Sequence, residues 1–280
     1  MRVLRRRGAR TGACRTVVFT LATAGFTAAL LIVPAVSSAS GNADRLTGAP
    51  RKALPPRGPS SSNQTFGGVA AVGTLFGTDP ATGKLGSHFC TASVVDSPGG
   101  DLAVSAAHCV TQHTGPMVFV PGYSKGRTPY GVWRVTKAYI SQAWKAMQDP
   151  DEDVAFLRIA PAPDGVPVED VAGAERLGTG WPSHTYVQVM GYPDVSDQPV
   201  WCANWTDSFS PTQLEFDCGG YTYGTSGSPF LAAVSRQTGE GTVIGVIGGH
   251  EQGGDTADVS YSVAFGPSVA SLYRTAVAGG

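Results

Sequence analysis

Residues 224–229 read Gly-Thr-Ser-Gly-Ser-Pro, with a glycine on each side of the Thr225-Ser226 pair. Such a run favours a tight, strained turn that exposes the Ser226 hydroxyl and leaves neighbouring N–H groups free. The segment alone is also compatible with an ordinary surface turn. Its meaning depends on whether the chain holds partners that can activate a serine hydroxyl.

Two further segments supply such partners. Ser105-Ala106-Ala107-His108-Cys109 follows an apolar run, and Asp153-Val154-Ala155-Phe156-Leu157 places an acid at the start of another. Taken singly, His108 suits a core histidine beside a disulfide, and Asp153 an acid that opens a strand. Together they match a chemical need, because a serine hydroxyl requires a base, and a carboxylate can orient that base. We therefore expect Ser226, His108 and Asp153 to form one site.

The spacing of apolar segments indicates an all-β fold. Short apolar runs bounded by Gly, Pro, Asp or Ser favour a β-sandwich or barrel over alternating β-α units. They are Val69–Phe76, Phe89–Val95, Leu102–Ser105, Met117–Val120, Val132–Ile140, Val154–Ile159, Tyr186–Met190, Thr242–Ile247 and Val259–Phe265. Residues 161–180, rich in Pro, Gly and acids, divide these runs into two sets, and the spacing over 267–277 predicts a short C-terminal helix.

These motifs together resemble the chymotrypsin/trypsin superfamily, whose catalytic residues follow the chain order His, Asp, Ser. The resemblance covers about residues 66–277 and includes His88-Phe89-Cys90 with the strand up to Val95. Val189-Met190-Gly191-Tyr192-Pro193, residues 224–229 and Val243–Ile247 are similar to the bacterial, glutamyl-endopeptidase-like branch. The resemblance implies two packed six-stranded antiparallel β-barrels, over residues 66–165 and 166–280, the second followed by the C-terminal helix.

The resemblance also implies a function and the role of each site residue. It predicts a serine endopeptidase in which Ser226 attacks the scissile carbonyl, His108 transfers the proton, and Asp153 orients His108. Asp149 and Asp151 lie nearby, but Asp153 directly precedes the family's strand pattern. Backbone N–H groups of Gly224 and Ser226 would form the oxyanion hole. No metal or other cofactor is expected.

The substrate-binding residues depart from known patterns. Trypsin has an aspartate directly before the nucleophile, whereas this chain has Thr225, so we expect no activation through an ion pair with a freed N-terminus. The positions that set Lys/Arg or Glu preference fall by offset at Gly220, Tyr221 and Ile247, which support neither preference. Gly248, Gly249 and His250 are expected to form an edge strand that pairs with substrate. His113 and His184 are interpreted as surface residues.

Four cysteines follow the N-terminal segment that contains Cys14: Cys90, Cys109, Cys202 and Cys218. An even number in an exported chain suggests two disulfides, and four cysteines permit three pairings. Pairing of sequence neighbours would close two short loops, and the family resemblance supports Cys90–Cys109 as the disulfide beside His108. Free thiols or a metal site are less compatible with the spacing, because no short Cys-x-x-Cys appears.

The N-terminal 39 residues read as an export signal. A basic head precedes an apolar run over 16–36, and Ser37-Ser38-Ala39 then offers a cleavage site. An uncleaved membrane anchor is the alternative, since a run of that length just spans a bilayer. Residues 40–65, rich in Pro, Ser and Gly, are expected to be a linker or pro-segment. We therefore expect a secreted, extracellular monomer with no stable membrane association after cleavage.

Charge is distributed unevenly along the chain. Ten of its twenty Lys and Arg residues lie at or before Arg57, and the chain from Phe66 onward holds ten basic and twenty acidic residues. Such a domain should be repelled by nucleic acid and by anionic membranes, so polypeptide substrates and protein protease inhibitors are the expected partners. Two alternatives stay open: a secreted serine esterase, and a catalytically silent binding module on the same fold.

Overall fold

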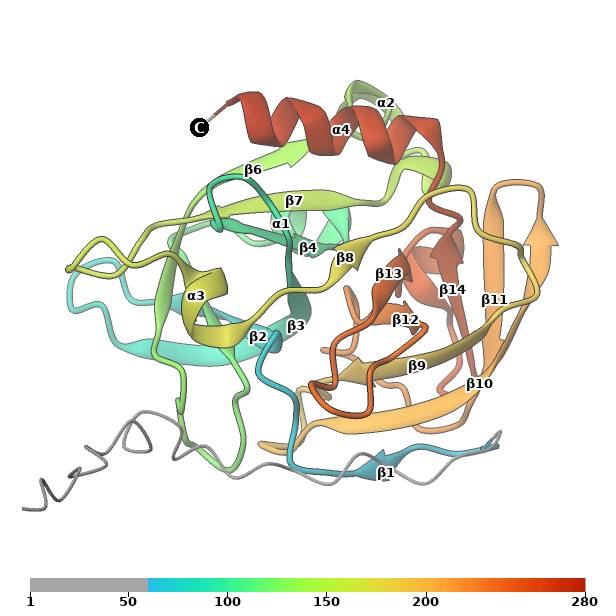
Figure 1. Cartoon of the computed structure of the whole chain (residues 1–280), viewed down its shortest axis with the longest axis horizontal. Helices are drawn as coiled ribbons and strands as arrows, with labels where there is room; N and C mark the ends of the chain where they lie inside the picture. Colours follow the sequence, from blue (N-terminus) through green and yellow to red (C-terminus); the bar gives the residue numbers. More distant parts are fainter. Residues whose placement is uncertain (1–59, 280) are drawn as a thin grey trace, which may run out of the picture. The chain divides into compact units, whose positions relative to one another are not determined.

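The structure is a computed structural model that describes residues 60–279 (Figure 1). The predicted signal peptide, and residues 40–59 of the predicted linker, lie outside the described residues. All described elements belong to one compact unit, Ala49–Gly280. None of the helices in residues 60–279 is long and apolar enough to cross a membrane.

The first half of the described chain forms a closed antiparallel barrel. Its strand order is β2-β3-β4-β7-β6-β5. The strands are β2 (Val72–Thr78), β3 (Leu85–Val95), β4 (Leu102–Ser105), β5 (Met117–Pro121), β6 (Trp133–Ile140) and β7 (Ala155–Ile159). Every residue of β4 is buried, because this strand pairs with β3 on one side and with β7 on the other, where Val104 faces Phe156. This barrel confirms the first of the two that the resemblance predicted.

The second half forms an eight-stranded sheet rather than a plain six-stranded barrel. Its order is β14-β11-β10-β9-β12-β13-β8, and β1 adds to β10. The strands are β1 (Gln64–Thr65), β8 (Arg176–Leu177), β9 (Tyr186–Gly191), β10 (Val200–Ser210), β11 (Gln213–Asp217), β12 (Pro229–Ala232), β13 (Thr242–Val246) and β14 (Val259–Val263). An antiparallel bridge between Ile247 and Ser262 links the ends of the β9–β14 set. The short β1 and β8 are additions, and β1 lies in the segment expected to be a linker.

Helices occupy the connections and the C-terminus. They are α1 (Ala107–Gln112), α2 (Gln142–Met147), α3 (Val168–Ala172) and α4 (Pro267–Ala278), with 3-10 turns η2 (Pro150–Glu152) and η3 (His250–Gly253). The predicted C-terminal helix is therefore present as α4. In Figure 1 it lies across β6 and β7 of the first barrel, where Tyr139 Oη donates to Gly279 O at 2.9 Å.

A shared core joins the two halves. Val72, Phe156, Met190 and Leu231 belong to one buried cluster that also takes in Val269 of α4. The connection between the halves adds hydrogen bonds: Glu175 N donates to Val94 O, and Asp96 N donates to Glu175 O, both at 2.9 Å. Because the core is continuous, loops that meet at this junction are held at fixed positions, which suits a site built from both halves.

Candidate active site

The loop at 224–228 has two backbone N–H groups free. Thr225 N donates to Thr222 O at 3.1 Å, Gly227 N to Ile247 O at 2.7 Å, and Ser228 N to Thr225 O at 3.0 Å. Within the described chain, the N–H groups of Gly224 and Ser226 have no acceptor. The loop therefore presents the same two donors that the sequence assigned to an oxyanion hole.

Gly224 is fixed as glycine by its surroundings. Its φ is +89°, in the left-handed region. A Cβ at this position would lie 2.5 Å from Asp194 N and 2.6 Å from Tyr192 O, both backbone atoms that cannot move aside cheaply. Thr225 is buried, and its hydroxyl donates to Thr222 O at 2.7 Å. The position before Ser226 is thus held by a local hydrogen bond and carries no ion pair.

His108 and Asp153 form a buried hydrogen-bonded pair. His108 lies in the first turn of α1, directly after β4, and Asp153 lies between η2 and β7, which pairs with β4. His108 Nδ1 is 2.7 Å from Asp153 Oδ2, and the exposed fractions of the two residues are 4% and 0%. Two backbone N–H groups also donate to the carboxylate: His108 N to Oδ1 at 2.8 Å and Gly249 N to Oδ2 at 2.9 Å.

These contacts set the direction of the imidazole. Asp153 accepts at Nδ1, so the other ring nitrogen, Nε2, is the atom left to face the cleft. Of the neighbouring acids, Asp151 instead accepts from Gln213 Nε2 at 2.7 Å, and Asp149 accepts from Asp151 N. The structure thus separates Asp153 from the two nearby aspartates, as the strand pattern indicated.

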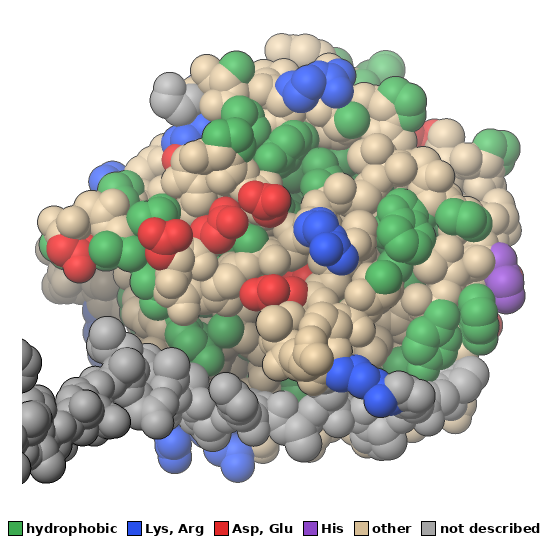
Figure 2. All heavy atoms as spheres, viewed as in Figure 1, with side chains coloured by type: hydrophobic (Ala, Val, Ile, Leu, Met, Phe, Trp, Pro, Cys, Tyr) green, Lys and Arg blue, Asp and Glu red, His purple; other side chains and the backbone are tan. Residues whose placement is uncertain are grey.

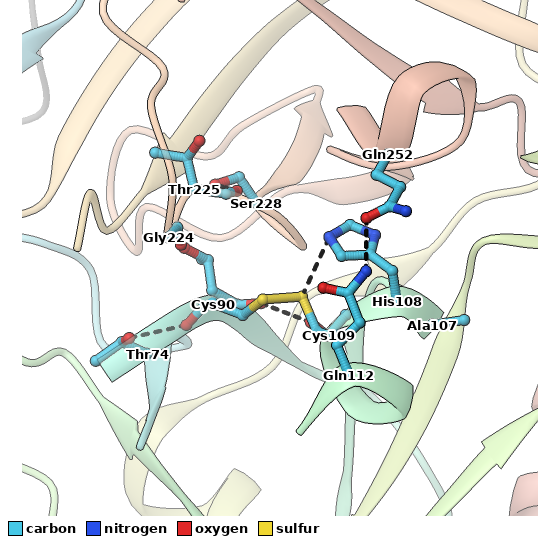
Figure 3. Close-up of a disulfide and its surroundings, with 12 residues drawn as sticks. Thr74, Cys90, Ala107, His108, Cys109, Gln112, Gly224, Thr225, Ser228 and Gln252 are labelled. Carbon is cyan, nitrogen blue, oxygen red and sulfur yellow. Dashed lines mark hydrogen bonds between the residues drawn. A yellow bond between two sulfur atoms is a disulfide. The ribbon is translucent and has the colours of Figure 1, made fainter. Parts of the chain in front are cut away.

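A disulfide lies against the His108 ring. Cys90 of β3 and Cys109 of α1 are bonded with their Cα atoms 6.2 Å apart, and Cys202 and Cys218 form the second disulfide. The predicted pairing is therefore the one found. Figure 3 shows the His108 ring between this disulfide and Gln252, with His108 Nε2 3.7 Å from Cys109 Sγ.

Ser226 and His108 line the same cleft, which has a volume of about 830 Å³. Within residues 60–279 the Ser226 hydroxyl makes no hydrogen bond to His108. Hydrogen bonds between catalytic groups are often long before substrate binds and shorten in the reactive complex. One cleft thus holds the half-buried Ser226 hydroxyl, the oriented His108 imidazole and two free backbone N–H groups. These are the groups that acyl transfer requires.

Thr91 of β3 fixes this loop, a role that the sequence motifs did not indicate. Its N–H donates to Ser226 O at 2.8 Å, and its hydroxyl donates to Gly224 O at 3.1 Å. The same hydroxyl accepts from Tyr192 N at 3.0 Å. The available signal was a threonine within the apolar run 89–95, because a hydroxyl buried in such a strand must find hydrogen-bond partners.

The residues expected to bind substrate divide into two groups. Tyr221 and Ile247 line the cleft, while Gly220, Gly248, Gly249 and His250 are not among its lining residues. The Tyr221 hydroxyl donates to Val189 O at 2.8 Å, so it is already satisfied inside the protein. Its ring contributes an apolar wall and leaves no free polar group to select a substrate side chain.

The expected edge strand at 248–250 does not form, which corrects that prediction. Strand β13 ends at Val246, and Gly249 has a φ of +83°, outside the extended region that a strand requires. The chain then enters η3, where His250 packs against Phe209 and Tyr261 at ring distances of 4.5 and 4.8 Å. Gly248 and Gly249 serve a different purpose, because they lie against the Asp153 carboxylate.

The cleft is acidic and contains one histidine that was expected at the surface. Asp194, Glu251 and Asp255 line it, and its described lining includes no Lys or Arg. His113, interpreted as a surface residue, also lines the cleft and stacks on Phe89 at 4.5 Å. His184 does lie at the surface, stacked on Trp205 at 4.7 Å.

His88 also lines the cleft, and His108 lies beside Cys90 and Cys109. Burial lowers the pKa of His88, whose Nδ1 has no partner in the described chain. Cys90, His108 and Cys109 bring their ligand atoms within 4.8 Å of one another. They do not fit a metal ion, because the disulfide has consumed both thiolates.

Comparison with known proteins identifies the fold. No model of a known protein family matches the sequence. No curated protein matches it either. Solved structures match well: Protease Anisep from Arthrobacter nicotinovorans is 23% identical over 77% of this chain and 99% of that chain, with a TM-score of 0.65.

Two further neighbours share the architecture. The thermostable serine protease AL20 from an extremophilic microorganism is 22% identical over 75% of this chain and 98% of its own, with a TM-score of 0.64. A Glu endopeptidase is 14% identical over 78% and 98% of the two chains, with a TM-score of 0.61. The chain thus has the chymotrypsin-like fold that the sequence motifs predicted.

Proposed function

We propose that this protein is a serine endopeptidase that hydrolyses peptide bonds through an acyl-enzyme on Ser226. The observation that carries the proposal is the buried His108–Asp153 pair, whose histidine lines the same cleft as Ser226, beside a loop with two free N–H groups. The fold shared with serine proteases supports the same conclusion.

Each residue has a defined step in this mechanism. His108 Nε2 removes the proton from Ser226 Oγ as the oxygen attacks the scissile carbonyl, and the same proton then passes to the leaving amine. Asp153 holds the imidazole in the required tautomer and stabilises the imidazolium. The N–H groups of Gly224 and Ser226 donate to the oxyanion, and each such donor is worth roughly 3 kcal/mol in comparable enzymes.

The proposal also covers the compartment in which the enzyme acts, its partners and its activation. Two disulfides suit an oxidising, extracellular compartment, in which a monomer would act on polypeptides and be open to protein inhibitors. Because Thr225 bonds to Thr222 O and carries no charge, the site should not require a freed N-terminus for assembly. Protein carrying an N-terminal extension should therefore be active.

Hydrolysis of a peptide library by wild type, Ser226→Ala and His108→Ala tests the proposal. We expect cleavage by wild type and loss of cleavage in both variants, with Ser226→Ala keeping the stability of the wild type. Cleavage of ester substrates with intact peptides would favour the esterase alternative. Equal activity of wild type and Ser226→Ala would show that Ser226 is not the nucleophile.

A further inference from the structure

A second cleft, lined by Lys and Arg, has the opposite charge to the cleft at Ser226. It has a volume of about 650 Å³ and shares no lining residue with the cleft at Ser226. Three segments build its walls: residues 66–70 before β2, the β5–β6 loop over 122–130, and the β12–β13 turn over 236–239, with Gln198 beside them. It therefore combines loops from both halves of the fold.

Three cations line this second cleft: Lys125, Arg127 and Arg236. None of the three makes an ion pair or a side-chain hydrogen bond within the described residues, and no acid is among the described lining. Figure 2 shows Lys and Arg side chains along the lower edge of the view, where Figure 1 places the β5–β6 loop. Acidic side chains gather instead over α3 in the same view.

The lack of ion pairs is informative because acids outnumber bases two to one from residue 66 onward. The nearby acids are engaged elsewhere. Asp197 Oδ1 accepts from the Tyr123 hydroxyl at 2.7 Å, and Glu240 points toward Gly173. Three of the ten Lys and Arg residues from residue 66 onward thus line the second cleft, and none of the three forms an ion pair within the described residues.

Apolar and aromatic side chains form the floor of the second cleft. Phe66 and Val69 pack against the shared core with their outer faces exposed. Gly122, with a φ of +60°, lets the Tyr130 ring lie directly on the backbone, since a Cβ there would come within 2.6 Å of that ring. Burial raises the pKa of Tyr130. A ligand that fits must therefore offer both negative charge and an apolar group.

We propose that this second cleft is a binding site for an acidic polypeptide segment in which carboxylates flank an aromatic or aliphatic side chain. The carboxylates would meet Lys125, Arg127 and Arg236, and the apolar side chain would lie on Phe66 and Tyr130. A peptide fits better than nucleic acid or an anionic membrane for two reasons. The apolar floor takes a side chain that a phosphate backbone lacks, and a short segment carries few of the charges that a domain with net charge −10 repels. The site is independent of the proposed hydrolysis and would anchor a substrate or partner away from the bond being cut.

Fluorescence anisotropy on a Ser226→Ala protein tests this proposal without cleavage of the probe. The probe is a labelled peptide, Gly-Asp-Phe-Glu-Glu-Leu-Gly, and its control is the same peptide with Asn and Gln in place of Asp and Glu. The variant is Lys125→Ala with Arg127→Ala and Arg236→Ala. Its matched control removes the same charge at exposed positions outside both clefts, with Lys84→Ala, Lys145→Ala and Arg274→Ala.

We expect the acidic peptide to bind the Ser226→Ala protein and to bind the triple variant in the same background about tenfold more weakly. Each exposed charge contact is worth a few tenths of a kcal/mol or more. The control variant should retain the affinity, and salt should weaken it. Equal binding to both variants, equal binding of the neutral peptide, or no binding at all would overturn the proposal. Hydrolysis of short neutral peptides by the triple variant with Ser226 intact should be unchanged, so this result and the proposed function can fail separately.

Discussion

Glu175 makes the stability of this protein depend on pH. Its exposed fraction is 0%, Oε2 accepts from Gly241 N, and Oε1 has no partner in the described chain. Burial raises its pKa from 4.5 to about 8, with the backbone N–H of Gly241 opposing the shift. The folded state therefore holds a proton on this carboxyl that the unfolded chain releases near pH 4.5.

The sign and size of the effect follow from linkage. Between the two pKa values the folded state binds more protons than the unfolded state, so the free energy of unfolding falls as pH rises. The contribution is fully present below pH 4.5 and is lost as pH rises through about 8. Each pKa unit corresponds to about 1.4 kcal/mol, so the total loss is about 5 kcal/mol.

Glu175→Gln tests this expectation. Glutamine keeps the acceptor for Gly241 N and cannot ionise, so the variant should lack this part of the pH dependence. Urea unfolding from pH 4 to pH 9, in a Ser226→Ala background to prevent autolysis, would measure both proteins. Their difference should change by about 5 kcal/mol over that range in favour of Gln.

The control for this experiment is Asp170→Asn, which removes an exposed carboxylate from α3. It should leave the pH profile of the wild type nearly unchanged. If the profiles of wild type and Glu175→Gln ran parallel from acid to alkaline pH, the buried carboxyl would not titrate as the structure requires, and this reasoning would be refuted.

Three further predictions concern the proposed active site. Asp153→Asn should lower kcat on the order of 10⁴-fold with a smaller change in KM, measured by steady-state hydrolysis. Thr91→Val should lower kcat about tenfold because it frees the loop at Gly224 and orphans a buried N–H group, and Thr91→Ser should restore the rate. Glu251→Gln with Asp255→Asn should lower kcat/KM for substrates that carry Lys or Arg a few-fold relative to neutral substrates, most clearly at low salt, because both acids line the cleft.

Elements with continuous apolar runs were predictable from the sequence. Leu102–Ser105 and Val154–Ile159 became β4 and β7, because both lie buried between neighbouring strands. Helix α4 was predictable from its apolar spacing, which buries Val269 and Ala276. Strand β10 was not, because only its first four residues form an apolar run, and its second half is mostly polar and largely exposed.

The proposed catalytic residues were recognisable because each stands in a local sequence that its geometry demands. Gly224 must be glycine for its φ, and His108 must follow a buried strand to reach Asp153. The lining of the cleft was not predictable. It depends on the left-handed backbone at Glu251 and on contacts such as the Gln112–Gln252 hydrogen bond of 2.7 Å between distant segments.

The burial of Glu175 could not be predicted from the sequence. The residue lies in the segment 161–180, rich in Pro, Gly and acids, which the sequence indicated only as the division between the two sets of strands. Tertiary packing instead placed it between Val94 and Gly241, at the junction of the two halves. Burial of a carboxyl there is decided by elements far away in the sequence.

The central claim is that Ser226 is an activated nucleophile, and a fluorophosphonate probe tests it most directly. The probe would be incubated with wild type and with Ser226→Ala, and the labelled peptide would be located by mass spectrometry. The account predicts labelling of Ser226 in the wild type, absent from the variant, because an unactivated serine does not react. A folded and processed wild-type protein that takes up no label at Ser226 would contradict it and would favour a catalytically silent binding module.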